Sequence, residues 1–246
     1  MKRQFSKKLS RSVILGQILL AIIPGVLWWT AIAFRSPIIE TRCVSHPNSC
    51  TKEAVLEVDQ LSLGMEDWKA DHYSYQTQNT SGVLALLSPS FWEGALFLMG
   101  RVNAPAAIAA ASLDTWIVFQ TIAWNGLFTE TSHLISQRPR PFVYSNPAEK
   151  GQDPAHYTSF YSGHTSFTAA TQLALLLMLI RRKAPGWMVL LAAVSYQGFV
   201  LSTAYFRILA GRHFLTDVIC GAIAGSLVAW GLSQWHKRKK YTASSH

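Results

Sequence analysis

Long runs of apolar residues alternate with short polar segments along the whole chain, and most runs are about as long as a bilayer is thick. Five runs are well defined, and they cover residues 13–34, 104–128, 162–180, 185–206 and 214–235. Three of the five contain one ionisable residue each, namely Asp114, His164 and Asp217. A sixth, weaker run at 82–100 contains a proline and a glutamate. This pattern predicts an all-α, polytopic membrane protein with six transmembrane helices in a single domain over 1–246.

Composition and charge support this interpretation. Half of the 246 residues are hydrophobic and only 14% are charged, which is unusual for a soluble domain. The net charge of +9 is unevenly distributed, because 13 of the 22 Lys and Arg, and no Asp or Glu, fall in four segments. With the N-terminus in the cytoplasm, the cytoplasmic segments are 1–12, the turn at Arg101, the turn 181–183 and the tail from 236. This positive-inside distribution predicts both termini in the cytoplasm, in a bacterium at the inner membrane, and disfavours nucleic-acid binding.

The first apolar run has two interpretations. A basic leader and the triplet Ala31-Ile32-Ala33 resemble a cleavable signal peptide. However, the run has 22 residues, longer than the usual signal-peptide core of about 7–15, and Trp28-Trp29 stands where an interfacial belt is expected. The uncleaved transmembrane helix is therefore favoured.

One sizeable outside insertion, 35–81, separates the first two spans. Apolar residues recur in it at steps of four and three: Ala54, Val58, Leu61, Met65 and Trp68. This spacing predicts an amphipathic helix that lies on the outer membrane surface, covers a site or packs on its neighbours. A second outside loop, 142–161, is rich in turn-forming residues.

Two of the three cysteines, Cys43 and Cys50, fall in the outside insertion with six residues between them. In an oxidising compartment this spacing permits a small disulfide, and two free thiols are the alternative.

Polar residues recur at the outer end of four predicted spans. Arg138 and Arg140 follow the third span, Arg207 ends the fifth, and the remaining members open the fourth and sixth spans: Ser162, Gly163, His164, His213 and Asp217. Ionisable groups that share one depth in a membrane protein mark a site. Arginine forks and helix N-termini bind oxyanions, so the site is predicted to bind a multiply charged oxyanion.

The spacing of these residues also indicates chemistry. His213 and Asp217 are four residues apart at the start of a helix, so the carboxylate can orient the imidazole and leave one ring nitrogen free for attack. His164 is then available as acid and base. Each feature alone has a structural explanation, such as a helix start or a hydrogen-bonded pair, and their order and shared depth favour a catalytic site.

The segments HLISQRPRP, YSGH and FRILAGRHFLTD resemble the three motifs KxxxxxxRP, PSGH and SRxxxxxHxxxD of the type 2 phosphatidic acid phosphatase and vanadium haloperoxidase superfamily. The resemblance implies that His213 is the phosphorylated nucleophile, Asp217 its orienter and His164 the acid and base. It also implies phosphoryl binding by Arg140, Arg207, Ser162 and Gly163. No metal or other cofactor is implied.

Three positions depart from the motifs: His133 replaces lysine, Tyr161 replaces proline and Phe206 replaces serine. The first matters most, because lysine is a permanent cation at neutral pH and histidine titrates near 6.5. His133 charged by the bound phosphate, or Arg138 as a helper, would compensate for the missing lysine.

The leading hypothesis is hydrolysis of a lipid phosphate or pyrophosphate, through a phosphohistidine, at the outer leaflet. Undecaprenyl pyrophosphate, phosphatidylglycerophosphate, phosphatidic acid and lipid A phosphates are the candidate substrates that the resemblance implies. A phosphotransferase with the same intermediate, and a degenerate protein that only binds lipid phosphate, are the alternatives.

Overall fold

The computed structural model describes residues 11–242, which form helices, turns and no strand. Six helices in this part of the chain are long and apolar enough to cross a membrane, which confirms the predicted fold class. They are α1 (Arg11–Phe34), α3 (Trp68–Leu98), α4 (Ala104–Ser136), α6 (Gly163–Arg181), α7 (Gly186–Leu209) and α8 (Leu215–Thr242). The protein is an integral, multi-pass membrane protein. The predicted basic segment 1–12 lies mostly outside the described residues.

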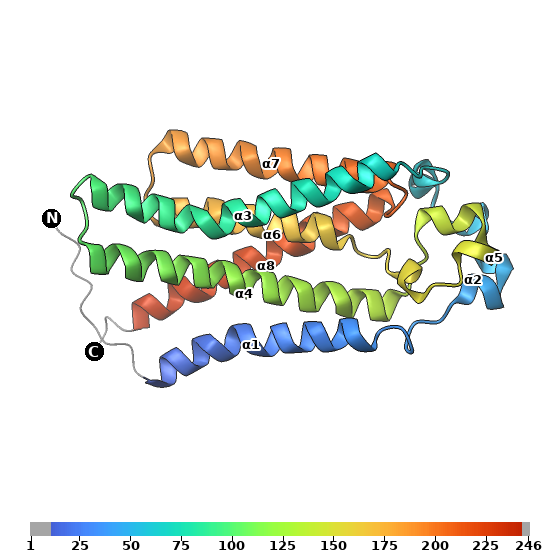
Figure 1. Ribbon diagram of the computed structural model, residues 1–246, viewed down its shortest axis with the longest axis horizontal. Coiled ribbons are helices and arrows are strands. Elements are labelled where there is room, and N and C mark those ends of the chain that lie inside the picture. Colours follow the sequence, from blue (N-terminus) through green and yellow to red (C-terminus); the bar gives the residue numbers. More distant parts are fainter. Residues whose placement is uncertain (1–10, 243–246) are drawn as a thin grey trace.

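The helices run side by side and alternate in direction, so the long connections gather at one end of the bundle, the loop end (Figure 1). Short turns join α3 to α4 and α6 to α7 at the other end. The loop-end connections contain the short elements α2 (Arg42–Ser45), η1 (Pro47–Cys50), η2 (Lys52–Ala54), η3 (Glu57–Ser62), η4 (Pro141–Ser145), α5 (Pro147–Lys150) and η5 (Pro154–Tyr157).

Helix α6 packs against α3, α4, α7 and α8, and its most extensive interface is with α8. A Cβ atom on Gly225 of α8 would lie 2.0 Å from the carbonyl oxygen of Ser166, and one on Gly221 would lie 2.7 Å from that of Ser162. Small residues at these two positions therefore let the backbones of α6 and α8 meet, as is common between membrane helices.

The helices differ in their bounds from the predicted spans, most of all at the second and third spans. The second begins at Trp68 rather than at residue 82, and the third continues to Ser136 rather than ending at 128. Asp67 caps the start of α3, where its side chain accepts hydrogen bonds from the backbone nitrogens of Lys69 (2.8 Å) and Ala70 (3.2 Å). The helix is thus fixed at a position that hydropathy does not detect.

The prediction of an amphipathic helix over Ala54–Trp68 is wrong. The segment forms the 3-10 helices η2 and η3, and Gly64, with φ +79°, stops helical continuation before α3. Leu61 of the predicted apolar face is 67% exposed, whereas Asp59 of the predicted polar face is fully buried. Hydrogen bonds to Asp59, rather than burial of an apolar face, decide how this segment lies against α8.

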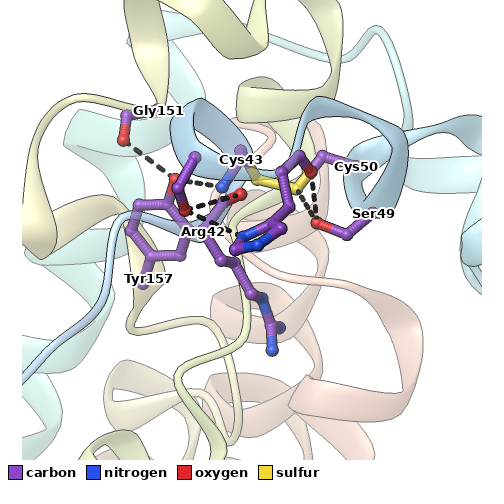
Figure 2. Close-up of a disulfide and its surroundings, with 8 residues drawn as sticks. Arg42, Cys43, Ser49, Cys50, Gly151 and Tyr157 are labelled. Atoms are coloured by element: carbon purple, nitrogen blue, oxygen red, sulfur yellow. Dashed lines mark hydrogen bonds between the residues drawn. A yellow bond between two sulfur atoms is a disulfide. The ribbon is translucent and has the colours of Figure 1, made fainter.

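The predicted disulfide between Cys43 and Cys50 is present, with 5.4 Å between the two Cα atoms (Figure 2). The Tyr157 hydroxyl accepts a hydrogen bond from the backbone nitrogen of Cys43 (3.0 Å) and donates to the carbonyl oxygen of Gly151 (2.8 Å). Tyr157 therefore ties the disulfide loop to the loop between α4 and α6.

Asp114, the acid in the third span, has its partners at the end of the bundle opposite the loop end. Asp114 binds Arg181 and, at 2.6 Å, the Nε atom of Arg182, which also lies 3.5 Å from Glu93. Both intramembrane acids therefore pair with the basic turn after α6 and lie far from the polar residues of the loop end.

Candidate active site

Six of the nine predicted site residues line one cavity of about 330 Å³ at the loop end. They are His133, Arg140, Gly163, His164, Arg207 and His213. The other three, Arg138, Ser162 and Asp217, lie behind the cavity wall. Other side chains of α1, α3, α4 and α6 complete the wall, so residues far apart in sequence share one space.

His213 lies in the turn between α7 and α8 and is only 2% exposed. Its Nδ1 atom is 2.7 Å from the carbonyl oxygen of Ser159, an acceptor, so Nδ1 carries the proton. The Nε2 atom then has the free lone pair. Burial and the neighbouring Arg207 and Arg140 hold the pKa of His213 well below its ordinary value of 6.5, although the bond to Ser159 opposes this. The ring is neutral at pH 7, the form that a nucleophile requires.

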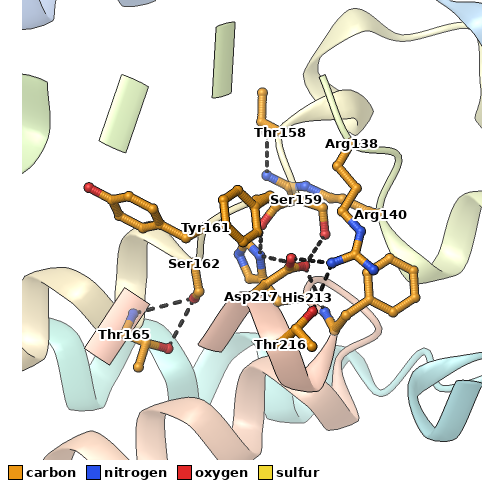
Figure 3. Close-up of polar contacts among 12 residues, drawn as sticks. Arg138, Arg140, Thr158, Ser159, Tyr161, Ser162, Thr165, His213, Thr216 and Asp217 are labelled. Atoms are coloured by element: carbon orange, nitrogen blue, oxygen red, sulfur yellow. Dashed lines mark hydrogen bonds and ion pairs between the residues drawn. The ribbon is translucent and has the colours of Figure 1, made fainter. Parts of the chain in front are cut away.

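Asp217 does not bond directly to His213, contrary to the sequence prediction, because its Oδ2 atom lies 3.9 Å from Nδ1. Oδ2 instead accepts hydrogen bonds from the Ser159 hydroxyl (2.6 Å) and the backbone nitrogen of Phe214 (2.9 Å). Ser159 thus connects the two residues, with its carbonyl on the imidazole and its hydroxyl on the carboxylate (Figure 3).

Arg138 is not among the residues that line the cavity, so its predicted role as a phosphate ligand does not fit its position. Its Nη1 atom donates to Asp217 (2.6 Å), its Nη2 atom donates to Asp59 (2.8 Å), and its guanidinium lies 4.0 Å from the centre of the Phe214 ring. Asp59 also accepts from the backbone nitrogen and the hydroxyl of Thr216. Arg138 therefore supports Asp217 from behind the site.

Two arginine side chains reach the cavity, Arg140 from the position before η4 and Arg207 from α7. Arg140 donates from Nη2 to Thr158 (3.0 Å), and Arg207 donates from Nη1 to Asp71 (2.7 Å). The Nε atoms of both are buried and have no hydrogen-bond partner among the described residues. Buried donors without partners are costly, and an anion in the cavity would satisfy them.

Asp71, which the sequence pattern did not predict as a site residue, also accepts from Arg212 at 2.9 Å and so holds two of the arginines. It lies in the first turn of α3, within the segment that was assigned to the insertion.

His164 and Ser162 are positioned by the start of α6. The Ser162 hydroxyl accepts from the backbone nitrogen of Thr165 (3.4 Å), so Ser162 caps the helix instead of facing the cavity. His164 lies in the first turn, where its ring meets Tyr75 edge-on with 4.4 Å between ring centres. Its Nε2 atom is buried and has no hydrogen-bond partner within the described residues.

The family model of the PAP2 superfamily matches residues 114–241, just over half of the 246. The chain belongs to the PAP2 superfamily. PAP2 membership implies phosphatase-type activity on phosphate esters, which agrees with the anion-binding geometry. Comparisons with curated proteins and with solved structures gave no match. The matched PAP2 region includes every predicted catalytic residue, whereas α1, α3 and the insertion lie outside it.

The three departures from the PAP2 motifs have different surroundings. Phe206 packs against Tyr73 on α3. Tyr161 is buried, which raises the pKa of its hydroxyl, and its carbonyl oxygen lies 3.1 Å from Nε2 of His133. The other ring nitrogen of His133 lies 3.5 Å from Glu130. Both nitrogens of the residue that replaces the PAP2 lysine therefore face other protein groups.

In the part of the chain that the structure describes, no three His, Cys, Asp or Glu side chains are grouped as a metal site would require. The charged donors around the cavity are arginines.

Proposed function

We propose that this protein hydrolyses a lipid phosphate or diphosphate through a phosphohistidine intermediate on His213. One observation supports this most directly: the Nε2 atom of a buried, neutral His213 is the free ring nitrogen beside a cavity that Arg140 and Arg207 also line. A neutral nucleophile beside unsatisfied guanidinium donors suits a phosphoryl group better than a neutral substrate.

In the first half of the reaction, the Nε2 lone pair of His213 attacks phosphorus and the bond to the leaving oxygen breaks. His164 donates a proton to that oxygen. The ring of His213 becomes cationic as the new P–N bond forms and keeps its Nδ1 proton, which stays hydrogen-bonded to the Ser159 carbonyl, itself held through the Asp217 network. Arg140 and Arg207 neutralise the phosphoryl oxygens, so the proposed mechanism needs no metal.

In the second half, His164 removes a proton from water, whose oxygen attacks phosphorus and breaks the P–N bond. Inorganic phosphate leaves, and His213 returns to its neutral form. If an alcohol replaced water in this step, the same intermediate would give a phosphotransferase.

The proposed substrate is a lipid because the cavity lies at the ends of helices that are long and apolar enough to span a membrane. With the basic turns in the cytoplasm, the loop end faces outward, so the phosphoryl group would be cleaved at the outer leaflet of a bacterial inner membrane. Undecaprenyl pyrophosphate, phosphatidylglycerophosphate, phosphatidic acid and lipid A phosphates are the substrates to compare.

The test is phosphate release from these four lipids by protein purified in detergent, beside the His213→Ala variant. We expect release from at least one lipid, loss of release in the variant, and a 32P label on His213 after acid-free denaturation. Binding of a lipid phosphate without release from any of them would refute the enzyme and favour the binding-only alternative.

A further inference from the structure

A third arginine lines the cavity, and neither the motifs nor the matched region includes it. Arg35 follows the last residue of α1, and its side chain is 28% exposed. Its Nη1 atom lies 3.6 Å from Oε1 of Glu130 on α4, a residue that also lines the cavity. Arg35 thus stands on the wall formed by α1 and α4.

The ion pair of Arg35 is loose in comparison with those of the other loop-end arginines. Arg138 lies 2.6 Å from Asp217, Arg207 lies 2.7 Å from Asp71, and Arg212 lies 2.9 Å from the same acid. Charge-assisted hydrogen bonds usually measure about 2.7–2.9 Å, so the 3.6 Å separation leaves the Arg35 donors available. An anion in the cavity can recruit Arg35 without breaking a tight bond.

Packing fixes the position of α1, and with it that of Arg35. A Cβ atom on Gly126 of α4 would lie 2.3 Å from the Trp28 ring, so α1 fits against α4 at this glycine. Closer to the other end, the indole nitrogens of Trp116 and Trp124 donate to carbonyl oxygens of α1 at 3.1 and 2.9 Å. The helix is therefore a fixed part of the cavity wall rather than a detached anchor.

His133, on the same wall, has both ring nitrogens near protein oxygens and is therefore poorly placed to donate to a phosphoryl group. Its ring nitrogens face the carbonyl oxygen of Tyr161 (3.1 Å) and the carboxylate of Glu130 (3.5 Å). Arg35 is the arginine that the α1–α4 wall contributes to the cavity, whereas Arg207 comes from α7.

We propose that Arg35 is a substrate-binding residue that contacts the phosphoryl oxygens and takes the place of the PAP2 lysine. This inference rests on the proposed function, because it requires a phosphate in the cavity. Glu130 holds Arg35 when the cavity contains no substrate, and the phosphate competes for it. The active site then includes a helix outside the family's matched region.

The experiment is a double-mutant cycle on Arg35 and Glu130, with inorganic phosphate as the probe. The inhibition constant of inorganic phosphate is measured from its effect on lipid phosphate hydrolysis, and its Kd is measured by calorimetry. Arg35→Gln is expected to weaken phosphate binding about tenfold, since a hydrogen bond to a charged group is lost. In the Glu130→Gln background, the same substitution should still cost about tenfold. If the loss disappears in that background, Arg35 only neutralises Glu130, and the proposal is wrong.

Three further variants complete the design. Lys69→Gln removes a cation from the exposed start of α3, outside the cavity, and should leave phosphate binding unchanged. An equal loss in Lys69→Gln would indicate a general charge effect and refute the contact. Arg35→Lys should retain part of the affinity, and His133→Lys should restore affinity to Arg35→Gln.

The double variant Arg35→Gln, Glu130→Gln exchanges an ion pair for a neutral hydrogen-bonding pair, so it remains informative where Arg35→Gln alone unfolds. A parent protein that binds phosphate but cleaves no lipid refutes the proposed function alone. An active parent with an unaffected Arg35→Gln variant refutes this inference alone.

Discussion

Asp59 and Asp217 share one guanidinium, that of Arg138, at 2.8 and 2.6 Å. The first acid belongs to the insertion between α1 and α3, and the second to the first turn of α8. The insertion therefore reaches the residue that supports the proposed nucleophile, through a chain that runs from Asp59 through Arg138, Asp217 and Ser159 to His213.

Substitution Asp59→Asn should lower kcat about tenfold and leave KM nearly unchanged. The amide oxygen can still accept from Thr216, but the amide nitrogen faces Arg138 and no longer holds its charge, so Asp217 loses its orientation. Steady-state kinetics on a lipid phosphate give both constants. Glu57→Gln is the matched control, because Glu57 lies exposed on the same 3-10 helix and loses the same charge. A similar fall in both variants would show that the insertion acts only through its total charge.

The pH dependence of kcat/KM should reflect the lowered pKa of His213. Because burial and two arginines lower this pKa, the ring stays neutral below pH 6.5 and is protonated only as the pH falls further. Activity should therefore persist below 6.5 and then be lost on the acid side.

Arg140→Gln removes one of the charges that lower this pKa, so it should move the acid limb of kcat/KM to higher pH. Arg140→Lys should leave the limb in place. Comparing variants on one substrate cancels the titration of the phosphate itself, which has a second pKa of about 6. Coincident acid limbs in all three proteins would contradict the assignment of this limb to His213.

Gly225→Ala should destabilise the bundle by about 1–3 kcal/mol, since the new Cβ atom would lie 2.0 Å from a backbone oxygen of α6. Thermal unfolding in detergent measures the change. Gly231→Ala, on the same helix with nothing within 4 Å of the new atom, should be neutral or stabilising. Equal melting temperatures for the two variants would rule out the close approach of α6 and α8.

Asp114→Asn should lower stability by about 3–5 kcal/mol, because it leaves the buried Arg182 without its closest acid. The activity of the folded fraction should not change, since the pair lies at the end opposite the cavity. Adding Arg182→Gln to the Asp114→Asn variant should restore part of the lost melting temperature. A double variant less stable than Asp114→Asn would contradict this account.

The sequence alone determined the number of spans, the positions where most of them lie and the order of the motif residues, because hydropathy and residue spacing are local properties. It also placed the polar residues at one end of the bundle. Successive spans run in opposite directions, so the C-terminal end of one span lies at the same end as the N-terminal end of the next. The partners of these residues were not predictable. Asp59 lies 79 residues from Arg138 and Asp71 lies 136 from Arg207.

The tertiary structure decided these pairings. Val58 and Leu61 follow a helical pattern, yet the segment forms a 3-10 helix because Asp59 gains three hydrogen bonds when it is buried against Arg138 and Thr216. Ser159, a loop residue that belongs to none of the motifs, likewise connects His213 and Asp217 through hydrogen bonds that only the folded chain forms. Arg35 enters the cavity only because Trp28 packs on Gly126 and brings the end of α1 beside α4. Such contacts depend on which helix faces join, and local sequence does not encode that choice.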